Sequence, residues 1–575
     1  MLLLFTGALL FLLRGPLFPN SYVLQPPPGG VVLWVFALYA AALAARASVQ
    51  HEAWIEVFTI ISYGVAYWVW SSLASHHKRW RWLLGAMMLS VTIMAWYALI
   101  QHGHDSNMVL SVPRPEQYEM RASGAYICPN HFASLLAIFL PMCLSLVLCR
   151  SAGGPLRLFA GYTILLALPP LFLSQSRSGW LGAMAGLAAC IVLLAWRTNT
   201  RRFLLAVVAT PVAIAVAGLA AWMLSPMVQS RVAAALRGDV RLNLWRDTWT
   251  MIQDSFLTGF GPGSYGFVYP HYRSHLVMYT DPKFAHNEYL HLLADYGLIG
   301  LILCSIFFVA AAFGFLRFLR GSEREKDAHM VAGLSGAVAA ALVHGIFDYN
   351  LHTFSISHAL IAFAGITASG LFASGDLKAR TVDGWRRGVI WITSASVLLV
   401  VMAVLTRMFI AYLITLSANK DKDLLRILAA ESKYTRAAAI DPLAWEPRLA
   451  LADLARLQGF WNIDKELRAK RNEDALRLYG EVLALNPWNA DALFGTYKTH
   501  MNMRQKEKGL ELLFRLVDTI PHHAYYLVEL GLRLREIGRD DEALVYFEKS
   551  LQAQPSEMAR VQIADIKAKK AKAAP

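Results

Sequence analysis

Long apolar segments constrain this chain more than any other feature of its sequence. A helix needs about 20 mostly apolar residues to cross the hydrocarbon core of a bilayer, and eleven such runs follow one another here. The apolar segment 1–13 is a twelfth candidate; it lacks the basic start and cleavage site of a signal peptide. The runs lie near residues 31–48, 54–74, 82–100, 131–149, 157–173, 179–196, 203–224, 295–316, 328–346, 353–373 and 388–416.

The charged residues divide the chain into two parts. Overall, 56% of the residues are hydrophobic and only 16% are charged, which excludes a single soluble domain. Residues 417–575, however, hold 26 Lys and Arg and 23 Asp and Glu, as a soluble domain would. We therefore predict a transmembrane domain over 1–416 and a soluble domain over 417–575. The net charge of +14 comes mainly from basic loops between apolar runs, which argues against a nucleic-acid partner.

Basic residues predict the orientation of the membrane part. Five of the connections are rich in Lys and Arg, and they alternate with connections that are not, so they are expected on the cytoplasmic side. The connections 101–130, 174–178, 225–294 and 347–352 then face outward, and so does the tail. This predicts a multi-pass protein of a bacterial inner membrane with a periplasmic tail. The basic residues are Lys78, Arg79, Arg81, Arg150, Arg157, Arg197, Arg201, Arg202, Arg317, Arg320, Arg324, Lys326, Lys378, Arg380, Arg386 and Arg387.

The tail contains an internal repeat of 34 residues. This period resembles that of tetratricopeptide repeats, in which paired helices stack into a solenoid that binds protein partners. A small residue lets the two helices approach, a large apolar residue packs between them, and proline ends the second helix. A more degenerate unit ends at Asp441-Pro442, and an insertion at 458–471 lengthens the next step. The recurring positions are Pro487, Pro521 and Pro555; Ala475, Gly509 and Ala543; Leu476, Leu510 and Leu544; and Tyr479, Leu513 and Phe547. The predicted fold is therefore an all-α polytopic membrane protein of 11 or 12 spans followed by a helical-repeat solenoid.

Several motifs that suggest cofactors do not fit their context. The glycines at 259–266 precede no Gly-Lys-Ser/Thr and form a flexible turn rather than a nucleotide-binding loop. Asp421-Lys422-Asp423 resembles a metal-binding DxD element but follows the last span, so we interpret it as a charged linker. The five cysteines include no CxxC pair. We expect no cofactor and no metal site.

Polar residues at the ends of the spans are informative because a charge there is costly unless it is paired or used. They gather on the predicted outer side. Arg177 lies at a helix boundary, Arg241 begins an amphipathic segment of the loop 225–294, and His286-Asn287-Glu288 precedes the next span. A further polar cluster could line a site or bind a metal, although helix capping or cavity lining is the favoured interpretation; its residues are His344, Asp348, Asn350 and His352.

Taken in order, these segments resemble the O-antigen ligase and polymerase superfamily. Its members are membrane glycosyltransferases that use glycans linked to polyprenyl diphosphate. The resemblance covers roughly residues 1–416, and the repeat tail departs from typical lipid A-core ligases. It rests on Gly124-Ala125-Tyr126, Pro129-Asn130-His131-Phe132-Ala133, Ser176-Arg177-Ser178-Gly179, Arg241 with Trp245, Pro262-Gly263, Tyr269-Pro270, Tyr272-Arg273 and His286-Asn287-Glu288.

The resemblance implies a glycan donor attached to undecaprenyl diphosphate and transfer to an acceptor hydroxyl. Guanidinium groups suit the leaving diphosphate, so Arg177 and Arg241 are assigned to it. Imidazole suits deprotonation of the acceptor, so His286 is assigned as the base, with Asn287 or Glu288 orienting it. A single displacement would invert the anomeric centre without a metal. The remaining substrate-binding candidates are Arg273, Asn130, Tyr269 and Tyr272, the two tyrosines as part of a sugar-stacking surface over 265–272.

Other interpretations stay open. Arg177 could be an interfacial anchor, Arg241 could belong to a solvated helix face, and His286 could be bonded to the backbone at a helix start. The acceptor could be lipid A core, as in a ligase of lipopolysaccharide, a growing glycan, or a Ser or Thr of a protein, which the repeats mildly favour. A non-enzymatic scaffold that recruits a cell-envelope complex is a possibility of another class. A transporter is disfavoured because the spans hold almost no acidic residues.

Overall fold

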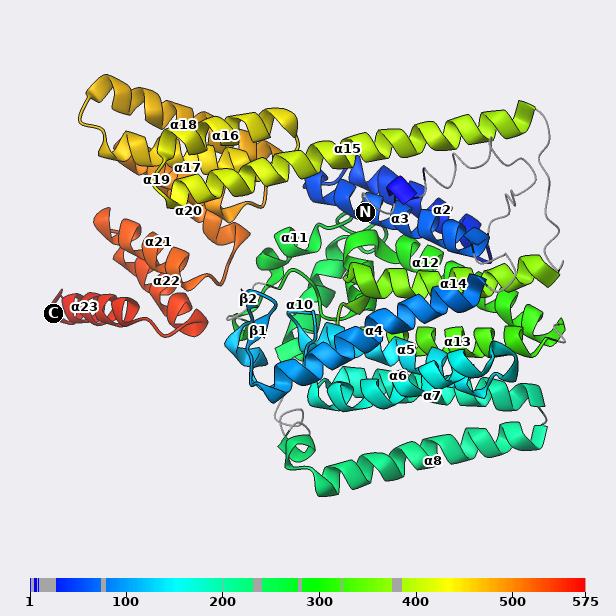
Figure 1. Ribbon diagram of the computed structural model, residues 1–575. Helices are drawn as coiled ribbons and strands as arrows, with labels where there is room; N and C mark the ends of the chain where they lie inside the picture. The colour runs from blue at the N-terminus through cyan, green and yellow to red at the C-terminus, as the bar shows by residue number, and fades with distance from the viewer. Residues whose placement is uncertain are drawn as a thin grey trace.

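The computed structural model describes residues 1, 5–7, 9, 27–73, 79–198, 200–230, 240–277, 282–321, 324–374 and 385–573. Within these ranges the chain is almost entirely helical, as predicted, with one two-residue hairpin in which β1 (Met108–Val109) pairs antiparallel with β2 (Val112–Pro113) (Figure 1). Most of the possible span at 1–13 lies outside the described residues, as do Lys78, Lys378 and Arg380.

Each of the eleven predicted apolar runs coincides with a helix. Among the described residues, eight of these helices are long and apolar enough to cross a bilayer, and α2 and α14 contribute shorter apolar helices. The chain is therefore a multi-pass membrane protein. The helices are α2 (Gly30–Ala44), α3 (Gln50–Leu73), α4 (Arg79–Gly103), α5 (Pro129–Leu148), α6 (Gly154–Leu173), α7 (Arg177–Thr198), α8 (Thr200–Leu224), α12 (Glu288–Gly321), α13 (Glu325–Gly345), α14 (Phe354–Ser374) and α15 (Trp385–Asp423).

Helices α5, α7 and α13 pack against one another, and α5 and α13 are the most deeply buried of the candidate spans. Small residues allow α7 and α13 to approach closely. A Cβ atom added to Gly186 would lie 2.7 Å from the carbonyl oxygen of Gly336, so no side chain larger than hydrogen fits there. This packing fixes the ends of α7 and α13, both of which carry polar residues of the candidate site.

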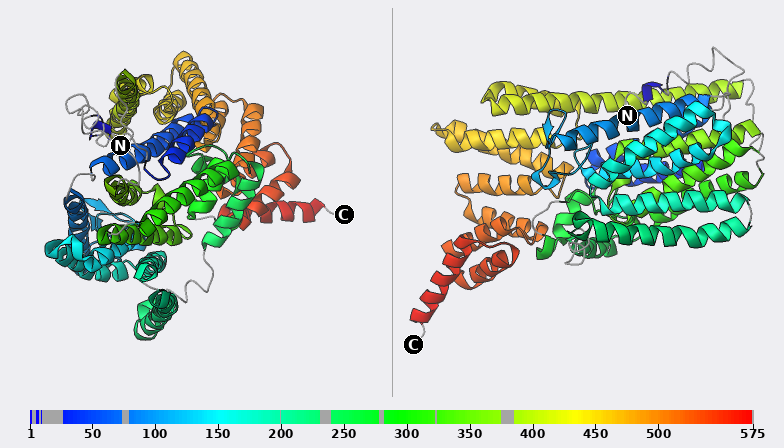
Figure 2. Two further views of the ribbon diagram at one scale, coloured as in Figure 1. Left: turned by 90° about the vertical axis from the view of Figure 1, so that its right-hand side faces the viewer. Right: turned by 60° about the horizontal axis from the view of Figure 1, so that its bottom comes forward.

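The connections of the bundle separate into two ends (Figures 1 and 2). The helix ends that flank the predicted basic connections, including η3 (Arg150–Ala152), lie at one end. The hairpin and the tail lie at the opposite end together with the other elements of the predicted outer connections, as the alternation of basic loops predicts. These elements are η2 (Glu116–Tyr118), α10 (Val240–Asp254), α11 (Tyr265–Tyr272), η4 (His275–Val277) and η5 (Asn350–His352). We call this the polar end of the bundle.

Helix α12 is broken at Gly297, which has a φ of +64° and a ψ of −171°. The glycine-rich segment 259–266 packs onto this break: Gly261 N donates to Asp295 O at 2.9 Å, and Leu298 N donates to Phe256 O at 2.8 Å. A Cβ atom on Gly297 would lie 2.4 Å from the carbonyl carbon of Leu257. The predicted turn at 259–266 is present, and its backbone is hydrogen-bonded to α12; its flexibility stays a prediction.

The tail forms the predicted helical repeats. The large apolar residues of the period, Tyr479, Leu513 and Phe547, are fully buried, and Phe547 packs closely against Gly531. Each of the prolines follows the second helix of a pair. The helices are α16 (Ile427–Ile440), α17 (Glu446–Trp461), α18 (Lys465–Leu485), α19 (Ala490–Asn502), α20 (Lys506–Thr519), α21 (Ala524–Glu536), α22 (Asp540–Ala553) and α23 (Glu557–Ala573).

The last span and the tail share one helix. Helix α15 continues through residue 416 to Asp423, and its final turns pack on α16. Asp421 lies 2.6 Å from Lys433 Nζ of α16. The interpretation of residues 421–423 as a linker was therefore wrong, because they form the end of α15. The division of the chain at residues 416 and 417 stays a prediction.

The two ends of the bundle can be assigned to the two faces of the membrane by cysteine labelling. We expect Thr250→Cys and Lys549→Cys to react with an impermeant maleimide in intact spheroplasts, and Ser151→Cys to react only after permeabilisation. The background should carry Cys128→Ala and Cys304→Ala, since the other three cysteines are buried. Reaction of Ser151→Cys alone in intact spheroplasts would invert the orientation.

Gly297 can be tested as the residue that allows the break in α12. Ala at this φ and ψ is strained and would collide with Leu257, so Gly297→Ala should lower the free energy of unfolding by about 2 kcal/mol or more. Gly85→Ala in α4 is the matched control, because its Cβ atom would meet nothing closer than 4.0 Å. Equal thermal midpoints for the two variants would show that the break tolerates a side chain.

Candidate functional site

A buried carboxylate, Asp348, lies at the centre of the polar groups at the polar end. It follows α13 in the short connection to α14, and only 1% of its side chain is exposed. Nδ1 of His286 lies 3.1 Å from Oδ1 of Asp348, and Nη2 of Arg241 lies 3.7 Å from Oδ2. A buried carboxylate requires such partners because burial of an unpaired charge is costly. The structure thus brings two of the predicted catalytic residues together around a third residue.

The surroundings keep Asp348 ionised. Burial by itself raises the pKa of the Asp348 carboxyl, but the hydrogen bond with His286 and the charge of Arg241 together lower this pKa well below its usual range. An ionised carboxylate only accepts hydrogen bonds, so Nδ1 of His286 is the nitrogen that donates to it, and in the neutral imidazole Nε2 then carries the lone pair. This is the tautomer in which His286 can act as a base.

Asn130 extends the network from the start of α5. Its Nδ2 donates to Oδ2 of Asp348 at 2.9 Å, and its Oδ1 accepts a hydrogen bond from Arg121 at 2.7 Å. Arg121 in turn donates through Nε to the carbonyl oxygen of Ser174 at 2.8 Å. Asn130 therefore contacts the carboxylate that holds His286. Arg121, which the sequence analysis missed, connects Asn130 to the segment before α7.

Helix α10 holds both His286 and Asp348 in place. Trp245 Nε1 donates to the carbonyl oxygen of Ala285 at 3.1 Å, and the Trp245 ring lies 6.3 Å from that of Phe347. Ala285 and Phe347 directly precede His286 and Asp348. Arg241 lies one turn earlier on the same helix. His286 has a φ of +49°, a strained conformation that persists because its neighbours fix the backbone.

Arg177 is the first residue of α7 and is half-buried. Its neighbour Ser178 has a hydroxyl oxygen 3.2 Å from Nε2 of His344, which lies on the last turn of α13. His344 is four residues before Asp348. Arg177 therefore belongs to the same end of the bundle, next to the helix that leads into the Asp348 connection.

Asn287 and Glu288 do not orient His286, contrary to the expectation. The Oδ1 atom of Asn287 accepts hydrogen bonds from the backbone N–H groups of Tyr289 and Leu290, both at 3.0 Å, and so caps α12. Glu288 pairs with His352, with 2.9 Å between Oε2 and Nδ1. The sequence suggested these two residues because they adjoin His286, whereas the partner of His286 comes from a connection 62 residues away.

The expected sugar-stacking surface over 265–272 is folded differently. Residues 265–272 form α11, in which Tyr269 is fully buried and donates its hydroxyl proton to Asp247 at 3.1 Å. Tyr272 is only partly buried and donates to Asp254 at 2.7 Å. Arg273, 6% exposed, lies beside Ser274, whose backbone N–H also donates to Asp247. Tyr269 therefore stabilises the outer loop, since a ring without exposed surface cannot stack on a sugar.

The residues of the polar cluster over 344–352 contact different partners. Asp348 holds His286, and His352 pairs with Glu288. Asn350 donates to Ser134 Oγ at 2.9 Å. In the ranges covered by the structure, this cluster does not form a group with the geometry of metal ligands. The interpretation of this cluster as capping or cavity lining stays a prediction.

The arrangement combines an imidazole with a guanidinium. His286 and Arg241, with 33% and 24% of their side chains exposed, both contact Asp348, which is buried. Such a site can take a proton from a hydroxyl group and stabilise a departing anion. In the sequence Asp348 stands out only as part of a polar loop, because nothing there pairs it with His286.

Part of the chain matches a known protein family. Residues 162–305 match the model of a family described as O-Antigen ligase. The matched segment extends from α6 into α12 and includes Arg177, Arg241 and His286. This part of the multi-pass protein is thus similar to a membrane glycan-transferring enzyme. A comparison with curated proteins found no match.

Solved structures that are similar to parts of the chain include helical-repeat proteins. The crystal structure of MamA has 19% sequence identity, with 27% of this chain and 84% of that chain covered and a TM-score of 0.23. A thermophilic TPR protein of Thermus thermophilus has 19% identity, coverage of 26% and 77%, and a TM-score of 0.23. Yeast Tom70 has 12% identity, coverage of 72% and 85%, and a TM-score of 0.20.

The pair of Glu288 and His352 makes stability depend on pH. Burial lowers the pKa of His352, but the charge and hydrogen bond of Glu288 outweigh burial, and the result is a pKa of about 9. Because this value exceeds the ordinary 6.5, the contribution to stability is complete below pH 6.5 and is lost as the pH rises through 9.

Glu288→Gln should therefore lower the thermal midpoint most at pH 6, with the difference from wild type shrinking toward pH 10. Melting curves across this pH range measure the effect. Glu116→Gln in the exposed η2 is the control and should give no pH-dependent difference. A Glu288→Gln difference that is constant across the range would mean that His352 is not held protonated by Glu288.

Proposed function

We propose that this protein is a membrane glycosyltransferase that moves a glycan from undecaprenyl diphosphate to an acceptor hydroxyl at the outer face of a bacterial inner membrane. The observation that carries the proposal is the contact of His286 and Arg241 with the buried carboxylate of Asp348. The O-antigen ligase match over 162–305, which contains both His286 and Arg241, supports it.

The first role belongs to His286. Its Nε2 takes the proton of the acceptor hydroxyl as that oxygen attacks the anomeric carbon of the glycan. The bond from the anomeric carbon to the diphosphate oxygen breaks, and its electron pair leaves with undecaprenyl diphosphate. A single displacement of this kind inverts the anomeric centre. Asp348, through Nδ1 of His286, orients the imidazole and stabilises the imidazolium that forms.

The second role belongs to the arginines. The developing diphosphate charge needs donors that stay positive and bind phosphate oxygens in pairs, which guanidinium groups provide. Arg241 lies beside His286 through their common contact with Asp348, and Arg177 starts α7 at the same end of the bundle. A guanidinium has five N–H donors and can hold a carboxylate and a phosphate together.

The repeat tail supports a role for a partner near this site. It lies at the polar end, and Nδ1 of His271 on α11 is 2.9 Å from the carbonyl oxygen of Asp518 in the repeats. Solenoids bind peptides and proteins on their concave surface. Such a surface suits a protein acceptor or an assembly partner. A protein acceptor, a growing glycan and lipid A core are therefore tested separately as acceptors.

The assignment of roles can be tested in the purified protein with an undecaprenyl-diphosphate glycan. His286→Ala should reduce transfer about 100-fold to 10,000-fold with little change in donor affinity, because it removes the base alone. Arg241→Lys and Arg177→Lys should weaken donor binding or turnover, since lysine lacks the planar fork. Donor binding and transfer are measured separately for each variant.

Two further variants complete the design. Asp348→Asn keeps the shape of the side chain but loses its charge, so transfer should fall while donor binding persists. His104→Ala, an exposed histidine at the polar end, is the matched control and should be fully active. Near-normal transfer by His286→Ala would remove His286 from the mechanism. Failure of the wild-type protein with all three acceptors would favour the non-enzymatic scaffold.

A further inference from the structure

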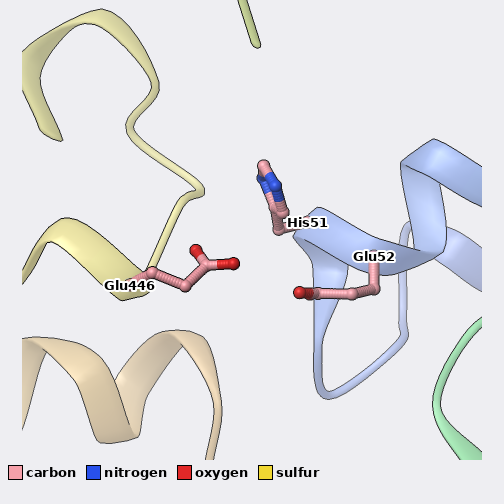
Figure 3. A group of neighbouring side chains, drawn as sticks. All are labelled: His51, Glu52 and Glu446. Carbon is pink, nitrogen blue, oxygen red and sulfur yellow. The ribbon is translucent and has the colours of Figure 1, made fainter. Parts of the chain in front are cut away.

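Three potential metal ligands meet where the tail contacts the membrane part. His51 and Glu52 belong to the first turn of α3, and Glu446 is the first residue of α17 in the repeats. One nitrogen or oxygen atom from each lies within 4.8 Å of those of the other two. Figure 3 shows the three side chains around a common space, two from α3 and one from the opposite segment.

Further contacts fix these ligands in position. Trp445 Nε1 donates to Oε1 of Glu52 at 3.2 Å, and the ring of Trp445 lies 6.1 Å from that of Phe267 in α11. Nδ1 of His51 lies 3.3 Å from Oδ2 of Asp441, whose side chain is 1% exposed. The cluster is therefore part of an ordered interface between the tail and the polar end.

Two carboxylate oxygens at this interface have no hydrogen-bond partner among the described residues. Oε2 of Glu52 and Oδ2 of Asp441 are buried and accept no hydrogen bond from the described residues. Arg407 lies 4.0 Å from Asp441, with 46% of its side chain exposed. Three carboxylates, those of Glu52, Glu446 and Asp441, thus surround one imidazole, and buried acceptors of this kind favour a cation.

We propose that His51, Glu52 and Glu446 bind a divalent transition-metal ion of the zinc type, which clamps the repeat tail to the membrane part. One imidazole nitrogen and carboxylate oxygens form a donor set that suits zinc better than the all-oxygen ions calcium and magnesium. Zinc ligands at bond lengths of about 2.1 Å stand about 3.4 Å apart, so small side-chain rotations from the present positions suffice.

Asp441 supports His51 as a metal ligand. A carboxylate next to one ring nitrogen of a ligating histidine fixes the tautomer and makes the ring a better ligand. Nδ1 of His51 lies 3.3 Å from Oδ2 of Asp441 without a hydrogen bond between them, so a small rotation that closes this contact leaves Nε2 for the metal. The ligands come from segments almost 400 residues apart, and none of them contacts Asp348, so the ion acts on docking rather than on glycan transfer. The proposal is independent of the proposed function.

Zinc binding to the full-length, tag-free protein in nanodiscs tests the clamp. After treatment with a chelator, the wild-type chain should bind one zinc ion in titration calorimetry and elemental analysis. His51→Asn, Glu52→Gln and Glu446→Gln should each weaken binding at least tenfold, because every variant loses one of three ligands. Glu473→Gln, an exposed glutamate of α18, is the matched control and should bind zinc like the wild type.

Hydrogen exchange provides a second measurement. Zinc should slow amide exchange in residues 50–55 and 441–450 of the wild type and not in Glu446→Gln. Melting curves without metal show whether each variant is folded. Absence of saturable zinc binding by the wild type, or equal binding by the wild type and all three ligand variants, would overturn the proposal. Zinc binding without a change in amide exchange would show that the ion does not hold the tail to the membrane part.

Discussion

The buried carboxylate of Asp348 determines how the polar end is built. An ionised group with 1% exposure needs partners, and it draws them from separate segments: His286 before α12, Arg241 on α10 and Asn130 on α5. The same contacts bring a histidine and a guanidinium to one carboxylate. One set of interactions therefore compensates the buried charge of Asp348 and also positions the groups of the proposed chemistry.

The outer loop gives these partners a rigid support. Gly297 breaks α12 so that its first turns can leave the direction of the span, and the glycine-rich segment 259–266 is hydrogen-bonded to that break. Tyr269 and Asp247 then hold α11 against α10, which carries Arg241. His286 itself has a φ of +49°, so one strained backbone position lies in the candidate site, where a fixed geometry is useful.

The sequence predicted features that depend on local composition. Apolar length predicted the eleven helices, basic residues predicted which connections share an end, and the 34-residue period predicted the repeats. The sequence was less successful in predicting the contacts of residues that adjoin one another along the chain. Asn287 and Glu288 adjoin His286, yet they cap α12 and pair with His352, and residues 421–423 continue α15 instead of forming a linker. Adjacency in sequence does not determine where a side chain points.

By itself the sequence determined the class of the fold and the residues that could carry chemistry, because hydrophobic length, charge bias and residue type are properties of short segments. Only the tertiary structure decided which of them meet. Asp348 joins His286 across 62 residues, and Glu446 approaches His51 across almost 400. Such pairs arise from the packing of helices and the compensation of buried charge, and no local pattern records them.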